Sequence, residues 1–174
     1  GVLKSMSQSG TFLAIGLTGF NGIVEEIVSL DTPSFDELVE TRISLELQTV
    51  SLAAKRRTEA DLTRMKKALD AFKVKIIDGK DYLEEDLLFH LAIAKASKNT
   101  TLITLMLLIT PPILSNYKRD EVCEGDGINS EINKHEDIYF AIASKDPELA
   151  VKKMNDHFFK LSKHIENRNL NETK

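Results

Sequence analysis

The sequence predicts an all-α fold, an antiparallel bundle of six or seven helices. From residue 34 onward, apolar side chains recur every three or four positions, which is the period of an amphipathic helix. Turn and capping residues divide this pattern into segments of helical length. The 174 residues, 42% hydrophobic and 29% charged, have the size and composition of one main globular domain.

The helix boundaries follow from capping residues and prolines. Ser34 can cap the first helix, Thr58 opens the second, and Asp146 caps the last. Pro111 and Pro112 should break or sharply kink the fourth helix, because proline lacks the backbone donor that a helix interior needs. The expected helices are 34–57, 58–78, 81–97, 99–109, 131–144 and 147–167.

The two ends of the chain differ from this helical pattern. Residues 1–14 are rich in serine and glycine, and 11–13 form a short β-like run that, alone, could only be the second half of a hairpin. A weakly amphipathic stretch follows at 20–30 and ends in an Asp-Thr-Pro boundary. The tail, 169–174, is expected to fray.

Charge and composition argue against several classes of protein. With 23 basic and 27 acidic residues, the net charge of −4 does not favour a basic face for nucleic acid. The single cysteine, Cys123, excludes an intramolecular disulfide and a multi-cysteine zinc site. The longest apolar run, 102–109, is far shorter than the ~20 residues of a membrane span. These features favour a cytoplasmic protein without membrane contact.

Three of the four histidines fall on apolar stripes, where a core residue is expected: His90, His135 and His157, each in a different helix. Asp86 precedes His90 by one helical turn, so their side chains share a helix face. Buried imidazoles and carboxylates both need partners, and one divalent ion satisfies all of them. Three imidazoles and a carboxylate suit Zn²⁺, Ni²⁺, Mn²⁺ or Fe²⁺, and bundle cores commonly hold such sites.

Other interpretations of the histidines remain open. Inward histidines are commonly hydrogen-bonded core residues, and Asp86 with His90 can form a simple pair on one helix. His164 lies seven residues after His157, on a similar face, and competes with it as a ligand.

Four more residues are weaker candidates for chemistry. Arg42 and Glu46 are four residues apart, which fits either an ion pair within the helix or an arginine that binds an anion. Asn99 caps the fourth helix or, as a lesser alternative, contacts a ligand. Cys123 has no histidine near it in sequence, which disfavours a nucleophile.

A set of motifs extends over about 34–168. It consists of TRISLE at 41–46 with LAA at 52–54, DLLFH at 86–90 with A-x-A-S-x-N at 94–99, and H-x-x-I-x-x-A-I at 135–142 with Asp146, Ala150, Met154 and His157. In order and spacing, this set resembles the C-terminal effector-binding (FCD) domain of GntR-family bacterial transcription regulators of the FadR type. The combined pattern is specific, although its individual pieces are not.

The resemblance also assigns the parts of the chain. The start of the chain, with its Ser-Gly-Thr-Phe-Leu at 9–13, is similar to the end of that family's winged helix-turn-helix, except that leucine replaces the usual valine at 13. It implies that 1–14 is a remnant of the wing, 15–33 a linker, 34–168 the effector-binding and dimerisation bundle, and 169–174 a flexible tail. The recognition helix would be missing from this chain.

The function implied by the resemblance is that of a metal-containing, ligand-sensing domain of a homodimeric regulator, not an enzyme. It implies that the metal is held by Asp86, His90, His135 and His157. Arg42 and Asn99 would face an adjoining pocket for a small organic acid, and DNA would be bound only by the full-length protein. The alternatives are a small His₃Asp metalloenzyme, for which no general base stands out near the cluster, and a metal-free structural bundle.

Overall fold

The computed structural model describes residues 3–6, 10–13, 33–116 and 127–172, with side-chain burial for 33–114, 127–163 and 165. The chain divides into two compact units, Gly1–Pro33 and Ser34–Lys174. The stretch at 20–30 and Cys123 lie outside the described residues, as does the side chain of His164.

The first unit contains a two-stranded antiparallel sheet. Strand β1 (Leu3–Met6) pairs with β2 (Gly10–Leu13), in a register that sets Leu3 opposite Leu13 and Met6 opposite Gly10. The β-like run at 11–13 therefore has its partner strand within the chain. The sequence did not indicate β1, because Leu-Lys-Ser-Met contains no β-branched residue.

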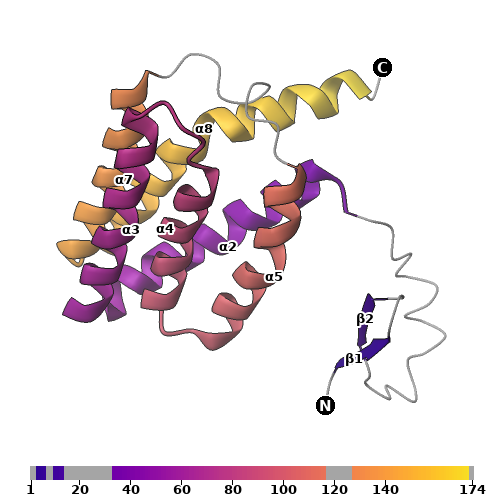
Figure 1. The fold of residues 1–174 in the computed structure, drawn as a ribbon, viewed down its shortest axis with the longest axis horizontal. Helices are drawn as coiled ribbons and strands as arrows, with labels where there is room; N and C mark the ends of the chain where they lie inside the picture. Colours follow the sequence, from indigo (N-terminus) through magenta and orange to yellow (C-terminus); the bar gives the residue numbers. More distant parts are fainter. Residues whose placement is uncertain (1–2, 7–9, 14–32, 117–126, 173–174) are drawn as a thin grey trace. The chain divides into compact units, whose positions relative to one another are not determined.

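The second unit is all-α, as predicted, with six helices in its described part. They are α2 (Phe35–Arg56), α3 (Glu59–Ile77), α4 (Leu83–Ala96), α5 (Thr100–Asn116), α7 (Ile128–Ala143) and α8 (Pro147–Glu172). Helix α2 packs against α4, α5, α7 and α8, while α3 packs against α4 and α7 (Figure 1). Across the described ranges, no helix combines the length and apolar character needed to span a bilayer.

The N-termini of α2, α3 and α8 lie where the capping residues predicted them. The Ser34 hydroxyl accepts a hydrogen bond from the backbone N–H of Glu37, whose carboxylate accepts one from the backbone of Ser34. Thr58 and Asp61 form the same reciprocal capping box at α3. Asp146 caps α8 by accepting a backbone N–H at 2.9 Å. These contacts satisfy donors that the first turn of a helix leaves unpaired.

The expected end of the fourth helix at 109 is wrong, since α5 is not broken and continues through Pro111 and Pro112 to Asn116. The two prolines cannot donate to the carbonyls of Leu107 and Leu108, one turn earlier. Both leucines lie on the exposed side of α5, and a carbonyl that water can reach does not need a partner within the helix. The helix therefore tolerates the missing hydrogen bonds.

Two helices extend beyond their expected ends. Helix α7 begins at Ile128 rather than at 131, and α8 continues to Glu172 rather than ending at 167. Residues 168–172 contain no glycine or proline, so nothing in the sequence stops α8 earlier.

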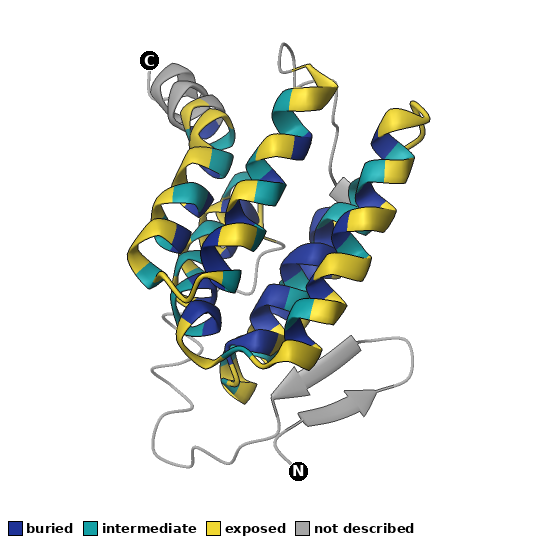
Figure 2. Cartoon of the chain, turned by 90° about the vertical axis from the view of Figure 1, so that its left-hand side faces the viewer, coloured by how far each residue is buried: buried dark blue, intermediate teal, exposed yellow. Residues whose placement is uncertain are grey.

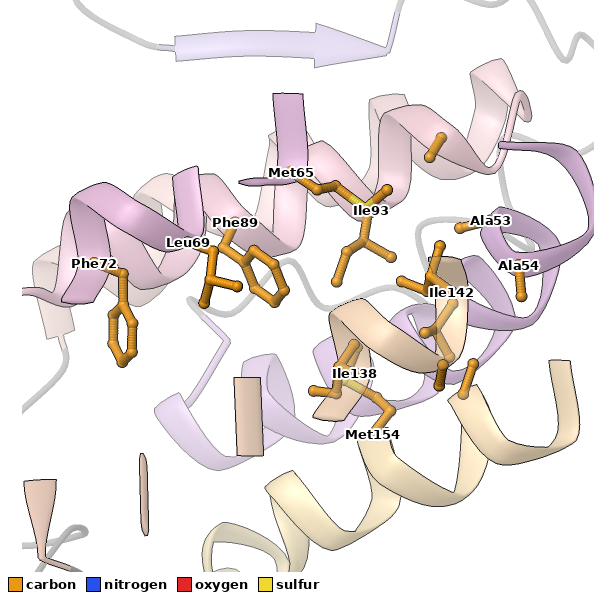
Figure 3. Packing of buried hydrophobic residues seen from close by; sticks show 14 of the residues in the cluster. Ala53, Ala54, Met65, Leu69, Phe72, Phe89, Ile93, Ile138, Ile142 and Met154 are labelled. Carbon is orange, nitrogen blue, oxygen red and sulfur yellow. The ribbon is translucent and has the colours of Figure 1, made fainter. Parts of the chain in front are cut away.

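The core lies between the inward faces of the helices, where buried residues line the interior and exposed ones the outside (Figure 2). Its apolar cluster contains residues of α2, α3, α4, α7 and α8. The labelled side chains of all five helices point into a common interior (Figure 3). Ala53 and Ala54 of α2 are fully buried, and their small side chains allow neighbouring helices to approach closely. Several polar side chains are also buried, among them Arg42, Glu46, His90 and His135.

Candidate metal centre

The structure brings together the four residues predicted to bind a metal. Asp86 and His90 come from α4, His135 from α7 and His157 from α8. Each residue offers one donor atom to a group in which all four atoms lie within 4.8 Å of one another. The donors therefore converge from three different helices, of which α4 is distant in sequence from the consecutive helices α7 and α8.

Helical periodicity places each donor on an inward face. Asp86 and His90 lie one turn apart on α4, with 3.8 Å between Asp86 Oδ1 and His90 Nε2. His135 follows buried Ile132 by one turn, and His157 lies between buried neighbours on α8. The His157 ring centroid is 5.0 Å from that of His90 and 4.6 Å from that of His135.

Two of the three imidazoles are oriented by contacts through Nδ1. His90 Nδ1 contacts Glu46 Oε2, and His135 Nδ1 lies 2.8 Å from the backbone carbonyl of Glu131. Both oxygens are acceptors, so each Nδ1 donates and each Nε2 faces the cluster. Histidines that bind metals usually donate their other ring N–H to a carboxylate or a carbonyl in this way.

The donor set fits a divalent cation. His90 Nε2 and His157 Nδ1 are buried and have no hydrogen-bond partner among the described residues. Leaving a buried polar atom unpaired costs about 1–3 kcal/mol. A cation bound by the cluster would give both nitrogens a partner, and nitrogen with carboxylate oxygen suits the borderline divalent ions.

The electrostatics favour a charged Asp86 and a neutral His157. Burial acts to raise the pKa of Asp86, but His90, His135 and Arg42 outweigh it and hold that pKa well below its usual range. Burial lowers the pKa of His157, and the neighbouring His135 and His90 lower it further. A charged carboxylate and a neutral imidazole are the forms that bind metal ions.

Arg42 is buried beside the cluster rather than on an exposed helix face. Its Nε donates to Glu46 Oε1 at 2.6 Å, and its Nη2 lies 3.4 Å from Asp86 Oδ2. Its guanidinium carbon is 5.4 Å from the ring centre of Phe158. The predicted ion pair with Glu46 therefore forms, and the same arginine also contacts a predicted metal ligand.

Glu46 is the site residue that sequence reasoning undervalued, because it was considered only as the partner of Arg42. Its side chain is 1% exposed and contacts both Arg42 and His90. A signal was present in the sequence: Glu46 lies four residues before Val50 and seven before Ala53, both fully buried. A carboxylate on that stripe needs partners from other helices.

Asn99 caps α5, as the sequence favoured. Its Oδ1 accepts a hydrogen bond from the backbone N–H of Leu102 at 3.2 Å, and its own N–H donates to Ser97 Oγ. Within the described part of the chain, no hydrogen bond joins Asn99 to the four-residue cluster. Its contact with an effector stays a prediction.

Fold and site together define a class: an all-α bundle with a buried His₃Asp centre and an adjacent arginine. The model of the FCD domain family matches residues 37–159. The chain therefore belongs to the FCD domain family.

Curated relatives agree with this assignment. The chain is 30% identical over 149 residues to the HTH-type transcriptional regulator LutR of Bacillus subtilis (strain 168), covering 83% of this chain and 68% of LutR. It is 29% identical over 161 residues to the uncharacterized HTH-type transcriptional regulator YcbG of the same organism, covering 90% of this chain and 64% of YcbG. The chain spans about two thirds of the length of these relatives.

Solved structures share the fold. Streptococcus agalactiae GntR superposes with a TM-score of 0.64 at 23% identity, covering 92% of this chain and 73% of that one. E. coli McbR/YncC gives a TM-score of 0.57 at 16% identity, covering 97% and 78%. The resemblance to GntR-family regulators is confirmed, and the relatives are transcriptional regulators rather than enzymes, as predicted.

Proposed function

We propose that this chain senses a small organic acid through a divalent metal ion held by Asp86, His90, His135 and His157. The observation that carries the proposal is the pair of unpartnered nitrogens, His90 Nε2 and His157 Nδ1, in a cluster with all four donors within 4.8 Å of one another. A zinc, nickel, manganese or iron ion bound there would offer further coordination positions to a carboxylate.

The charges around the centre favour an anionic effector. Arg42 carries one positive charge, and Glu46 and Asp86 carry one negative charge each, so the net charge of the group is −1 when the histidines are neutral. A bound divalent ion would change this net charge to +1. Because Arg42 and Glu46 are buried and the Asp86 side chain is only 15% exposed, little solvent screens this charge, and a monoanionic carboxylate would neutralise it.

We assign the contacts with that carboxylate to Arg42 and Asn99. The Arg42 guanidinium lies beside the donor group, with Nη2 3.4 Å from Asp86 Oδ2, which supports a contact with a carboxylate bound at the metal. Arginine also binds carboxylates through two parallel hydrogen bonds, which gives geometric specificity. Asn99 would contribute its side-chain amide N–H, since its Oδ1 serves the α5 cap.

In the full-length regulator, effector binding would control DNA binding. The acid must bind two arrangements of the bundle with different affinities, because equal affinities would leave the equilibrium between the two arrangements unchanged. We propose that 15–33 transmits this shift to a winged helix-turn-helix that includes 1–14, and that the protein acts as a cytoplasmic homodimer.

Elemental analysis and native mass spectrometry of the purified chain test the proposal together. We expect about one divalent ion per chain and a bound small acid that leaves when the metal is chelated. The quadruple variant D86N/H90A/H135A/H157A is the control and should carry neither. A folded wild-type chain that binds no divalent ion when metal is supplied would favour the metal-free structural bundle and contradict the proposal.

A further inference from the structure

We infer that Glu46 is the positioning residue of this centre, with one carboxylate oxygen orienting His90 for the metal and the other orienting Arg42. The inference rests on the proposed function, because it assigns the group that prepares the proposed metal site. Glu46 donates no atom to the four-residue donor group, so it acts through its neighbours.

The contacts of Glu46 use both of its oxygens. Oε2 contacts His90 Nδ1, and Oε1 accepts from Arg42 Nε at 2.6 Å. The Glu46 side chain is 1% exposed and that of His90 is fully buried, so water does not compete for these contacts. Glu46 belongs to α2 and His90 to α4, so the contact also fixes one helix against the other.

The contact with His90 selects the imidazole tautomer that a metal ligand needs. A carboxylate only accepts hydrogen bonds, so His90 Nδ1 carries the proton. In the neutral ring, Nε2 then has the free lone pair. His90 Nε2 is the atom without a hydrogen-bond partner, 3.8 Å from Asp86 Oδ1 and within the donor group. Glu46 thus turns the correct nitrogen toward the metal in advance.

The contact with Arg42 protects a second ligand. Arg42 Nη2 lies 3.4 Å from Asp86 Oδ2, so Arg42, Glu46, His90 and Asp86 form a closed ring of contacts. Without Glu46, the guanidinium would lose its 2.6 Å partner and turn to Asp86, where it would compete with the metal for the carboxylate. His135 is less sensitive to substitution, because its Nδ1 faces a backbone carbonyl.

Zinc affinity of the intact chain tests this role. Competition with a chromophoric chelator would give the Zn²⁺ dissociation constant of wild type, Glu46→Ala and Glu46→Gln. Losing a group that orients a metal ligand typically weakens binding about 10–100-fold. We expect Glu46→Ala to weaken Zn²⁺ binding by a factor near the upper end of this range. We expect Glu46→Gln to weaken it by a factor near the lower end, because the glutamine oxygen still accepts a hydrogen bond from His90 Nδ1.

Asp61→Asn is the matched control. Asp61 is also a buried carboxylate, 1% exposed, but it is paired with Arg64 and Lys98 at the start of α3. Its substitution should lower the stability of the bundle while leaving the Zn²⁺ dissociation constant within about twofold of wild type, as expected for a site that shares no partner with the cluster. Histidine ¹⁵N chemical shifts supply a second readout: His90 should be protonated at Nδ1 in wild type and lose that preference in Glu46→Ala.

The outcomes separate this inference from the proposed function. If wild type binds Zn²⁺ and both Glu46 variants bind it equally tightly, the positioning role is wrong and the metal site stands. If Asp61→Asn weakens binding as much as Glu46→Ala, the effect is one of stability and the positioning role is again wrong. If wild type binds no Zn²⁺, the proposed function fails and this inference fails with it. Should Glu46→Ala not fold, Glu46→Gln decides alone.

Discussion

His135 Nε2 lies 2.7 Å from Asp86 Oδ1, and this contact joins α7 to α4 in the interior of the bundle. The other oxygen of the same carboxylate lies 3.4 Å from Arg42 on α2. Asp86 is therefore the residue at which the proposed metal ligands meet the proposed anion-binding arginine. An ion bound by Asp86 would change the charge that Arg42 experiences, so the proposed metal binding would be coupled to the proposed effector binding.

Chelation of the metal should lower the melting temperature of the chain. The ligands come from three helices, so the unfolded chain cannot present them together and binding energy stabilises the fold. At a free metal concentration ~100 times the dissociation constant, linkage contributes about 2.7 kcal/mol. For a chain of this size, this corresponds to about 5–11 °C, measurable by differential scanning calorimetry.

Two histidine variants, one test and one control, identify the ligands in the melting experiment. His157→Ala should abolish most of the metal-dependent increase in melting temperature, whereas His164→Ala should leave it nearly intact. The reverse ranking would show that His164 is the ligand. An unchanged melting temperature after complete metal removal would identify the histidines as core residues.

Arg42→Lys should weaken effector binding while the chain stays folded. Lysine keeps the positive charge that Glu46 and Asp86 need, but it cannot form two parallel hydrogen bonds with a carboxylate. We expect a loss of about 1.5–3 kcal/mol of binding free energy. Calorimetric titration of the zinc-loaded chain with acetate, malonate and succinate measures it.

Lys153→Ala is the matched control for Arg42→Lys. Lys153 pairs with Asp137 on the surface, so its removal should leave affinity unchanged. If the wild type and Arg42→Lys bind every acid with equal affinity, Arg42 does not contact the effector.

Asp61 should contribute to stability at neutral pH and lose that contribution in acid. Burial acts to raise the pKa of Asp61, but hydrogen bonds from Lys98, Thr58 and Arg64 outweigh it and lower the pKa in the folded chain. A carboxyl group whose pKa is lower in the folded chain than in the unfolded chain stabilises the fold at every pH above its unfolded pKa. The contribution therefore falls as the pH drops below about 5.

Urea unfolding at pH 7 and pH 3 measures this contribution. Asp61→Asn should cost about 1–3 kcal/mol at pH 7 and less at pH 3, where the unfolded carboxyl is mostly protonated. Asp70→Asn, which removes an exposed partner of Lys66, should change stability little at either pH. A pH-independent cost for Asp61→Asn would contradict the assignment.

The sequence was sufficient to predict the bundle and the donor group, because both depend on helical periodicity. His90, His135 and His157 interrupt apolar stripes, and a stripe fixes which way a side chain points even when the partner helix is unknown. Asp86 follows from its one-turn spacing to His90. Capping residues likewise predicted the starts of α2, α3 and α8.

Contacts between helices could not be predicted in the same way. The Glu46–His90 contact joins α2 to α4 across 44 residues, and spacing within one helix gives no information about it. The continuation of α5 through Pro111 and Pro112 occurs where Leu107 and Leu108, one turn earlier, are exposed, and only the packing of α5 determines that exposure. Both features are properties of the packed bundle rather than of local sequence.

A crystal grown with Zn²⁺, with diffraction data collected on both sides of the zinc absorption edge, tests the central claim most directly. The account predicts one strong anomalous peak per chain, within bonding distance of Asp86, His90, His135 and His157, at about 2.0–2.2 Å from the ligand atoms. Well-ordered density for the four side chains with no anomalous peak among them, at saturating Zn²⁺, would contradict it.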